Sequence, residues 1–316
     1  MPAFTASSPG KAILFGEHAV VYGQPAIAVP IRQVQARAIL TPSPRSQPGA
    51  IRIQAPAIGL DADLQSLPAD HPLAMCIRLV LTHLNLRDAP ACKVRITSTI
   101  PLAAGLGSGA AVSVALIRVF SAYLGKPFPP KLVSELAYQV EKLYHGTPSG
   151  IDNSVVTYAR PVYFVRGQPI EMLQSPAPFT LVIGDTGIAS PTAEAVADVR
   201  LAWQSDPEHY ETLFNEIGAL VREARFALEK GQIERCGALM DLNHTLLRKM
   251  GISSQELDRL VECARQAGAL GAKLSGGGRG GNMIALATSE SADHIRARLA
   301  AAGASRTIVS RVEEQK

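Results

Sequence analysis

The fold of this chain is decided by the stretch from Thr99 to Phe120, which reads TIPLAAGLGSGAAVSVALIRVF. Residues 92–100 overlap its start. Apolar and polar side chains alternate in these residues, and many are β-branched, which predicts a strand. Residues 110–124 are apolar on nearly every face until Arg118, which predicts a buried helix. The stretch therefore contains the end of a strand, a Gly-rich turn and the start of a helix.

Three glycines, Gly105, Gly107 and Gly109, occupy this turn. They leave the backbone unshielded at a helix N-terminus, where unpaired N–H groups and the helix dipole favour an anion. The turn is a candidate phosphate cradle, although tight packing of small residues explains it equally well. It is not a Walker A loop, because no Gly-Lys-Ser/Thr ends it. It is not a dinucleotide fingerprint either, because its glycines have the wrong spacing.

Two further motifs frame this one. Residues 8–22 read SPGKAILFGEHAVVY, and residues 273–286 read KLSGGGRGGNMIAL. Together with PLAAGLGSGAA at 101–111 and PSGIDN at 148–153, they resemble the ordered motifs of the GHMP kinases. This superfamily includes galactokinase, homoserine kinase, mevalonate kinase and phosphomevalonate kinase. The first motif resembles the form found in mevalonate kinases.

The resemblance implies an α+β, two-domain GHMP kinase fold. A ribosomal-protein-S5-like N-terminal domain would span residues 1–175, and a ferredoxin-like C-terminal domain would span residues 176–316. It also implies Mg²⁺-dependent transfer of the γ-phosphoryl group of ATP to mevalonate, giving 5-phosphomevalonate for isoprenoid biosynthesis. One alternative is a related kinase acting on phosphomevalonate or homoserine. Another is a non-catalytic ligand sensor, which would lack Lys11, Glu141 or Asp152, and all three are present.

The second motif is implied to bind ATP through Pro101, Gly105, Leu106, Gly107, Ser108, Gly109 and Ala110. Ser108 and Glu141 are the implied Mg²⁺ ligands. Many relatives have a second serine where this chain has Gly109, so either Ser108 reaches the ion or a water fills that position. On the residues alone, Glu141 borders the apolar stripe of an amphipathic helix over residues 131–145, and the commoner fate of a helical Glu is a surface carboxylate.

The implied catalytic residues are Lys11 and Asp152. Lys11 is expected in a turn at residues 8–11, where a lysine is ordinarily a solvated surface group. The resemblance instead implies that it faces the transferred phosphate or the attacking hydroxyl. Asp152 opens a short predicted helix, where the dipole favours any carboxylate. The resemblance implies that it removes the hydroxyl proton or orients the hydroxyl.

The implied substrate-binding residues are Lys11, Glu17, His18, Thr192, Gly276 and Gly277. Glu17 and His18 could otherwise be a hydrogen-bonded structural pair. Asp185 stands where related kinases have Asn in the loop that leads to Thr192. Residues 276–281 formally match a dinucleotide fingerprint, but a predicted strand follows them where a helix is required.

Hydrophobic periodicity predicts the remaining elements. We expect two strands at 34–40 and 51–54 joined by a hairpin loop at 41–49, and a helix at 72–84. The 131–145 helix should bury Leu143 on its apolar stripe. The second half should contain strands at 179–184, 272–275, 282–287 and 306–312, helices over most of 192–268 with breaks near Pro207, Gly231 and Gly251, and a helix at 290–301.

Composition narrows the class of protein. The chain has 316 residues, 47% of them hydrophobic and 18% charged, with a net charge of +4. The chain has no run of basic residues and no apolar span of ~20 residues, which disfavours nucleic-acid and membrane partners. Because no basic segment precedes an apolar one near residue 1, we expect no secretory leader. The four cysteines are far apart and are expected to be reduced. We expect a cytoplasmic protein that binds a small-molecule substrate. If the protein forms an oligomer, we expect a homodimer.

Overall fold

The computed structural model describes residues 2–101, 104–145, 148–175, 177–190 and 192–313. The chain divides into two compact units built from interleaved segments. Unit 1 comprises Met1–Gly10, Val34–Pro101 and Gly107–Ala159, and unit 2 comprises Lys11–Gln33, Leu102–Leu106 and Arg160–Lys316. These two units are groups of residues in mutual contact and are not consecutive domains. The domain boundary expected after residue 175 therefore stays a prediction. Pro176, at that boundary, lies outside the described residues.

Within the described residues, seven strands form a mixed sheet in the order β4-β3-β5-β2-β6-β7, with β1 paired to β2. β3 and β5 are parallel, whereas β2 and β5 are antiparallel. The chain passes from one unit to the other within β1 and within β2. The strands are β1 (Phe4–Phe15), β2 (Ala26–Pro42), β3 (Ile51–Ala55), β4 (Leu60–Asp63), β5 (Cys92–Ser98), β6 (Val162–Phe164) and β7 (Glu171–Met172).

The loop after β2 does not close a hairpin, so that prediction is wrong. β5 lies between β2 and β3 in the sheet. The loop instead pairs with the segment that leads into β5, since Ser43 N donates to Ala91 O (2.8 Å) and Gly49 N donates to Ala89 O (2.9 Å). A polar, Pro-rich composition indicates that a loop occurs, but it carries no information about which later strand occupies the space between the two neighbours.

The turn expected at residues 8–11 is also absent, because β1 runs from Phe4 to Phe15 without a break. In the described chain β1 pairs with β2 and with no other strand. An edge position tolerates a proline such as Pro9, which lacks an N–H group. Lys11 is therefore a strand residue and is only 3% exposed. Lys11 is thus not the solvated surface group that a loop lysine ordinarily is, and burial of this ammonium requires polar surroundings.

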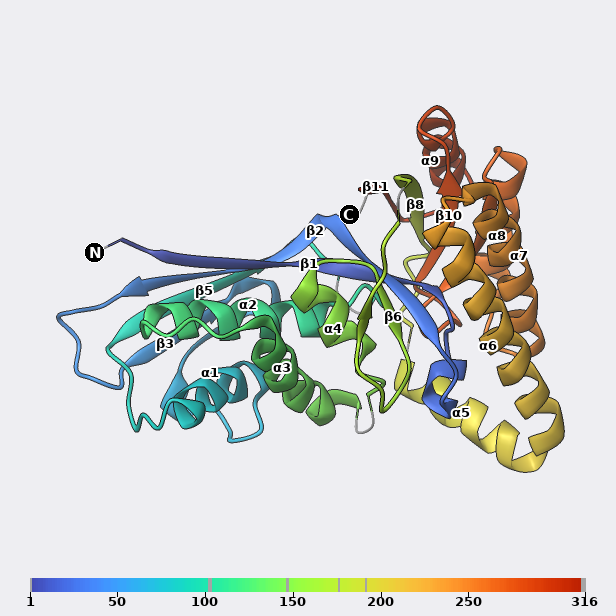
Figure 1. Ribbon diagram of the computed structural model, residues 1–316. Coiled ribbons are helices and arrows are strands. Elements are labelled where there is room, and N and C mark those ends of the chain that lie inside the picture. Colours follow the sequence, from blue (N-terminus) through green and yellow to red (C-terminus); the bar gives the residue numbers. More distant parts are fainter. Residues whose placement is uncertain (1, 102–103, 146–147, 176, 191, 314–316) are drawn as a thin grey trace. The chain divides into compact units, whose positions relative to one another are not determined.

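In unit 1, the helices lie along one face of the strands (Figure 1). α2 is buried along most of its length, as its uniformly apolar sequence predicts. On α3 the buried stripe includes Val133, Ala137 and Val140, whereas Leu143 is 43% exposed, so its predicted burial is wrong. Glu141 is 4% exposed and belongs to the buried stripe. The helices are α1 (Pro72–His83), α2 (Ser108–Tyr123), α3 (Pro130–His145) and α4 (Ile151–Tyr158).

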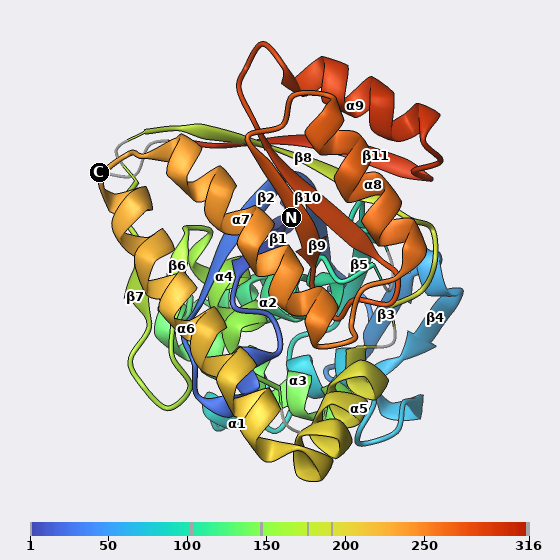
Figure 2. The same ribbon diagram turned by 90° about the vertical axis from the view of Figure 1, so that its right-hand side faces the viewer.

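Unit 2 contains an antiparallel sheet whose four strands, within the described residues, have the order β11-β8-β10-β9. Helices α7, α8 and α9 pack against it, and α6 packs on α7 (Figure 2). This strand order and connectivity are those of a ferredoxin-like fold. The elements are β8 (Phe179–Asp185), α5 (Thr192–Ser205), α6 (Pro207–Glu229), α7 (Ile233–Lys249), α8 (Gln255–Gln266), β9 (Gly271–Ser275), β10 (Asn282–Ala287), α9 (Ala292–Ala301) and β11 (Arg306–Val312).

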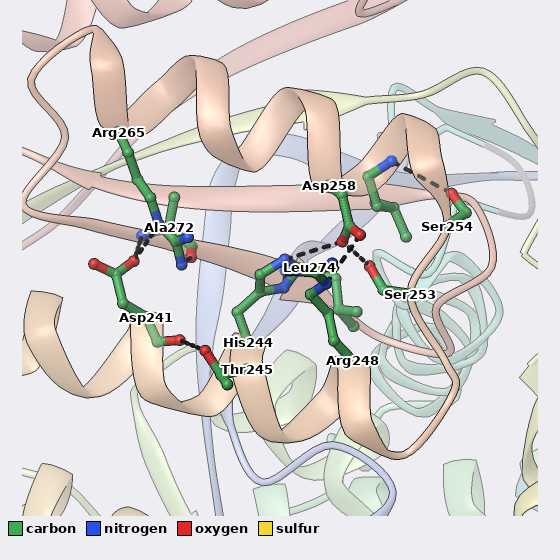
Figure 3. Close-up of polar contacts among 11 residues, drawn as sticks. Asp241, His244, Thr245, Arg248, Ser253, Ser254, Asp258, Arg265, Ala272 and Leu274 are labelled. Atoms are coloured by element: carbon green, nitrogen blue, oxygen red, sulfur yellow. Dashed lines mark hydrogen bonds and ion pairs between the residues drawn. The ribbon is translucent and has the colours of Figure 1, made fainter.

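Side chains of α7 cover the outer edge of β9 (Figure 3). Asp241 Oδ1 accepts hydrogen bonds from Ala272 N (2.9 Å) and from Arg265 Nε (2.6 Å), and His244 Nδ1 accepts one from Leu274 N (3.3 Å). An edge strand otherwise presents unpaired backbone groups on which other chains can add. Here two side chains of α7 accept the hydrogen bonds of the Ala272 and Leu274 N–H groups. These bonds hold β9 at one position along the helix.

His244 must be neutral to play this part. Its Nδ1 is an acceptor, so its proton is on Nε2, which lies 3.2 Å from Asp258 Oδ1. Asp258 is also bound by Ser253 Oγ (2.6 Å) and by Arg248 Nε (3.0 Å). Burial lowers the pKa of His244 to about 4, although Asp258 acts in the opposite direction. The imidazole is thus a fixed hydrogen-bonding bridge between β9 and α8.

In the part of the chain that the structure describes, no helix is both long enough and apolar enough to cross a membrane.

Candidate active site

The N-terminus of α2 has the features of an anion cradle. Its N-cap residue is Gly107, in the left-handed region (φ 72°, ψ 31°), and no side chain caps the first turn. Gly105 also has a positive φ of 77°. A side chain at either position would be strained, and the bare backbone leaves the N–H groups of the first turn available to a ligand. The observed geometry is compatible with a bound phosphate, and phosphate binding at this turn stays a prediction.

Residues on either side of this turn hold it in place. Leu106 and Ala110 are each 1% exposed. Within unit 2, Leu106 O accepts a hydrogen bond from Lys11 N (3.0 Å), so β1 supports the turn through its backbone. Pro101 is half-buried at the start of the motif. The apolar anchors and the backbone bond preorganise the cradle, which lowers the entropic cost of binding a ligand there.

Glu141 of α3 reaches the first turn of α2. A Cβ atom built on Gly109 would lie 3.3 Å from Glu141 Oε1. Ser108, the first residue of α2, is half-buried beside Gly109. No group of three or more His, Cys, Asp or Glu side chains that could hold a metal occurs among the described residues. This donor set fits Mg²⁺, which uses one or two carboxylates together with substrate phosphates and waters.

Asp152 lies in the first turn of α4, whose N-cap residue is Gly150 with a φ of 91°. The neighbouring Asn153 is buried and donates from Nδ2 to Ser134 O (3.1 Å) and to Ser134 Oγ (2.9 Å). These bonds fasten α4 to α3. Successive helix residues point about 100° apart, so Asp152 faces a different direction from Asn153 and is half-buried.

In unit 2, the first motif brings Glu17 against Lys273 of β9. Both side chains are fully buried, and Lys273 Nζ donates to Glu17 Oε1 and to Leu274 O (2.6 Å). Burial raises the pKa of Glu17 and lowers the pKa of Lys273, while the charge of each partner opposes both shifts. The close contact favours the ion pair. Glu17 Oε2 has no hydrogen-bond partner within the described residues.

His18 and the third motif meet at Gly277. His18 Nε2 lies 2.9 Å from Gly277 O, so Nε2 carries the proton and donates it. Burial lowers the pKa of His18 to about 4, which keeps the ring neutral. A Cβ on Gly277 would lie 2.7 Å from Thr192 Oγ1, so only glycine allows this approach. His18, Thr192 and Gly277 are therefore neighbours, and their role in binding a substrate stays a prediction.

The Gly-rich loop after β9 is held by hydrogen bonds on both sides. Ser190 Oγ donates to Gly278 O, Arg279 N to Ile252 O, and Gly281 N to Ile188 O, each at 2.8 Å. Gly276 has a φ of 96°, a left-handed conformation that favours glycine. The loop is a preformed surface, and a strand follows it, as the sequence predicts.

The predicted residues thus occur in two groups. Ser108, Gly109 and Glu141 come together in unit 1, which also contains Asp152. In unit 2, His18, Thr192 and Gly277 come together, and Lys11, Glu17 and Gly276 belong to the same unit. Sequence reasoning missed Lys273. The signal was present, because a lysine between Ala272 and Leu274 in an apolar strand requires a buried partner.

Comparisons with known proteins identify the family of this chain. The model for the GHMP kinases N terminal domain matches residues 72–160, and the GHMP kinases C terminal model matches residues 224–305. The chain is 38% identical over 298 residues to the mevalonate kinase of Thermococcus sibiricus, which covers 89% of this chain and 88% of the relative.

Solved structures agree as well. The mevalonate kinase of L. major in complex with R-mevalonate matches with a TM-score of 0.83 and 32% identity, covering 98% of this chain and 96% of that one. The Methanococcus jannaschii mevalonate kinase matches with a TM-score of 0.84 and 26% identity, covering 100% and 99%. The chain therefore belongs to the GHMP kinases, a class of ATP-dependent small-molecule kinases, and its α+β fold class is confirmed. Within that class it is a member of the mevalonate kinase family.

Proposed function

We propose that this chain transfers the γ-phosphoryl group of ATP to the primary hydroxyl of mevalonate, forming 5-phosphomevalonate and ADP. The observation that carries the reaction class is the uncapped N-terminus of α2 with Glu141 beside Gly109. The substrate follows from the relatives, which are named mevalonate kinases and include one bound to R-mevalonate.

The cradle at Pro101 and residues 105–110 binds the phosphates of ATP through backbone N–H groups. Ser108 and Glu141 would hold Mg²⁺, which would supply positive charge to neutralise the phosphates. The chain supplies one carboxylate and one hydroxyl, which leaves the other positions to phosphate oxygens and waters. Both donors stand on helices of unit 1, Ser108 on α2 and Glu141 on α3.

Lys11 and Asp152 act on the transferred group and the acceptor. The Lys11 ammonium stabilises negative charge on the transferred phosphoryl group. Asp152 accepts the hydrogen bond of the attacking hydroxyl. As the hydroxyl oxygen bonds to phosphorus, the bond between phosphorus and the ADP oxygen breaks and the hydroxyl proton leaves toward Asp152. Positioning and charge neutralisation supply most of the rate enhancement in such transfers.

Glu17, His18, Thr192, Gly276 and Gly277 bind the alcohol. The buried carboxylate of Glu17 accepts hydrogen bonds from hydroxyl groups, and the neutral ring of His18 contributes a polar edge at Nδ1, which has no partner in the described chain. Backbone groups of the Gly-rich loop complete this surface. The predicted cytoplasmic location, the absence of nucleic-acid partners and the homodimer stay predictions.

A coupled assay of ADP release tests the proposal with a panel of alcohols. We expect mevalonate to give the highest kcat/KM among mevalonate, phosphomevalonate, homoserine and galactose. A higher value for phosphomevalonate or homoserine would assign the chain to another branch of the superfamily. If none of these alcohols raises the rate of ADP release above that of a reaction without acceptor, a ligand sensor is favoured.

A further inference from the structure

The third motif contacts the first motif through alternate residues. Lys273 Nζ donates to Glu17, Ser275 Oγ accepts from Ile13 N (3.1 Å) and donates to Ile13 O (2.9 Å), and Gly277 O accepts from His18. Residues two apart in an extended chain point to the same side. The side of β9 that carries Lys273 therefore faces the segment with Glu17 and His18, and Ser275 fixes the position of that segment's backbone.

β9 cannot easily shift along this segment. Its Ala272 and Leu274 N–H groups, which alternate with Lys273, are bound by Asp241 and His244 of α7 (Figure 3). A slip of one residue would turn Lys273 away from Glu17. The ammonium is thus held at one position by the strand, and it in turn holds Glu17 Oε1.

A structural role alone accounts poorly for this pair. Placing two charges in the interior costs desolvation energy, and apolar residues of similar size often serve stability as well or better. Glu17 Oε2 and His18 Nδ1 are both buried and have no partner in the described residues, although an unsatisfied buried polar atom is costly. The arrangement leaves two adjacent residues each with one open polar atom at the predicted substrate-binding group.

We propose that Lys273 is a positioning residue for the alcohol substrate: it holds Glu17 Oε1 so that Oε2 is presented, as an ionised acceptor, to a substrate hydroxyl. This inference rests on the proposed function. Lys273 does not touch the reacting atoms in this role and acts through Glu17. It also links the third motif chemically to the first, across 256 residues of sequence.

The charges around Glu17 support the role. Burial raises the pKa of Glu17, and Lys273 of β9 and Lys11 of β1 both act to lower it. The adjacent His18 is neutral, because burial and the positive charge of Arg279 in the Gly-rich loop both lower its pKa. Removing Lys273 takes away the larger of the two influences from lysines, so the pKa of Glu17 should rise further. Lys11 alone would then favour the ionised form.

A mutant cycle tests the proposal with Lys273→Met, Glu17→Gln, the double variant, and Lys249→Met as a matched control at an exposed lysine of the same unit. For Lys273→Met we expect the KM for mevalonate to rise by roughly 10- to 100-fold, which corresponds to losing a hydrogen bond to a charged group. The KM for ATP should stay unchanged, and Lys249→Met should match the wild type in both.

Thermal unfolding separates positioning from stability. Lys273→Met should lower Tm, because it leaves a lone buried carboxylate, and the double variant should regain much of that loss. Its KM for mevalonate should nevertheless stay high. The contribution of Glu17 to the acid limb of kcat/KM should move to higher pH in Lys273→Met and should be absent when Glu17→Gln is added. Recovery of both Tm and KM in the double variant would overturn the proposal.

Failure of this inference differs from failure of the proposed function. A wild type that phosphorylates mevalonate, together with a Lys273→Met variant of normal KM and lowered Tm, would leave the function intact and make Lys273 purely structural. A wild type that prefers another alcohol would refute the substrate, and the same cycle with that alcohol would decide on Lys273. A wild type inactive on every alcohol would overturn both.

Discussion

Asp152 and Asn153 are adjacent residues of α4 with different surroundings. Asn153 is buried and its amide is bound to Ser134, whereas Asp152 is half-buried at the start of the helix. Helix periodicity separates their directions, so the anchoring of Asn153 fixes where Asp152 points. Because the packing of Asn153 orients Asp152, the carboxylate of Asp152 is suited to accepting a proton from an accurately placed hydroxyl.

We predict that Asp152→Asn lowers kcat by at least ~10², because general-base help contributes about 10²–10⁴ to such reactions. The KM for ATP should change little. Steady-state kinetics with mevalonate measures both constants, and Glu135→Gln, which removes an exposed carboxylate of the same unit, serves as the control. Near-normal kcat in Asp152→Asn would leave Asp152 as a helix-start residue without a catalytic role.

The N-terminus of α2 and the buried face of α3 form a pair of elements in unit 1. Glu141 replaces an apolar residue on the buried stripe of α3 and comes within reach of Gly109. A side chain at position 109 would be tight against that carboxylate, which must then move by a few tenths of an ångström. The missing hydroxyl at Gly109 is thus directly beside the predicted metal ligand.

For this pair of elements we predict a metal phenotype. Ser108→Ala should raise the Mg²⁺ concentration needed for half-maximal rate, because it removes a hydroxyl from the helix N-terminus at which the phosphates and the ion would be held. Adding Gly109→Ser should partly restore it. A Mg²⁺ titration of the initial rate checks both variants. If Ser108→Ala titrates like the wild type, Glu141 is left as the side-chain ligand and water fills the remaining position.

At the scale of the whole molecule, two buried neutral histidines make stability depend on pH. His18 and His244 have pKa values lowered by burial to about 4, below the ordinary value of 6.5. Between these values the unfolded chain binds more protons than the folded chain, so stability falls as pH is lowered from about 6.5 to about 4. Protonating His244 would also place an N–H group against Leu274 N–H.

We predict that His244→Gln flattens this dependence. Tm measured between pH 4 and 7 should fall less steeply toward acid in the variant than in the wild type, because one of the two histidines no longer titrates. The absolute Tm is not the readout, since the substitution also changes hydrogen bonds to Leu274 and Asp258. Parallel curves would show that His244 does not contribute to the acid sensitivity.

The sequence alone determined those features that depend on neighbours along the chain. Periodicity correctly predicted α1, α2, α3 and almost every element after residue 179, and the three motifs indicated the GHMP kinase family. Local patterns suffice there because helices repeat within a few residues and a Gly-rich turn is a local structure. The family in turn implied the fold class and the reaction.

Only the tertiary structure decided which distant residues meet. The sequence did not reveal that β5 separates β2 from β3, that β1 buries Lys11 without a turn, or that Lys273 pairs with Glu17. Each depends on strand order and register between segments far apart in the chain. A buried charge carries no local sign of its partner, because the free energy that compensates its desolvation comes from whichever segment the fold places beside it.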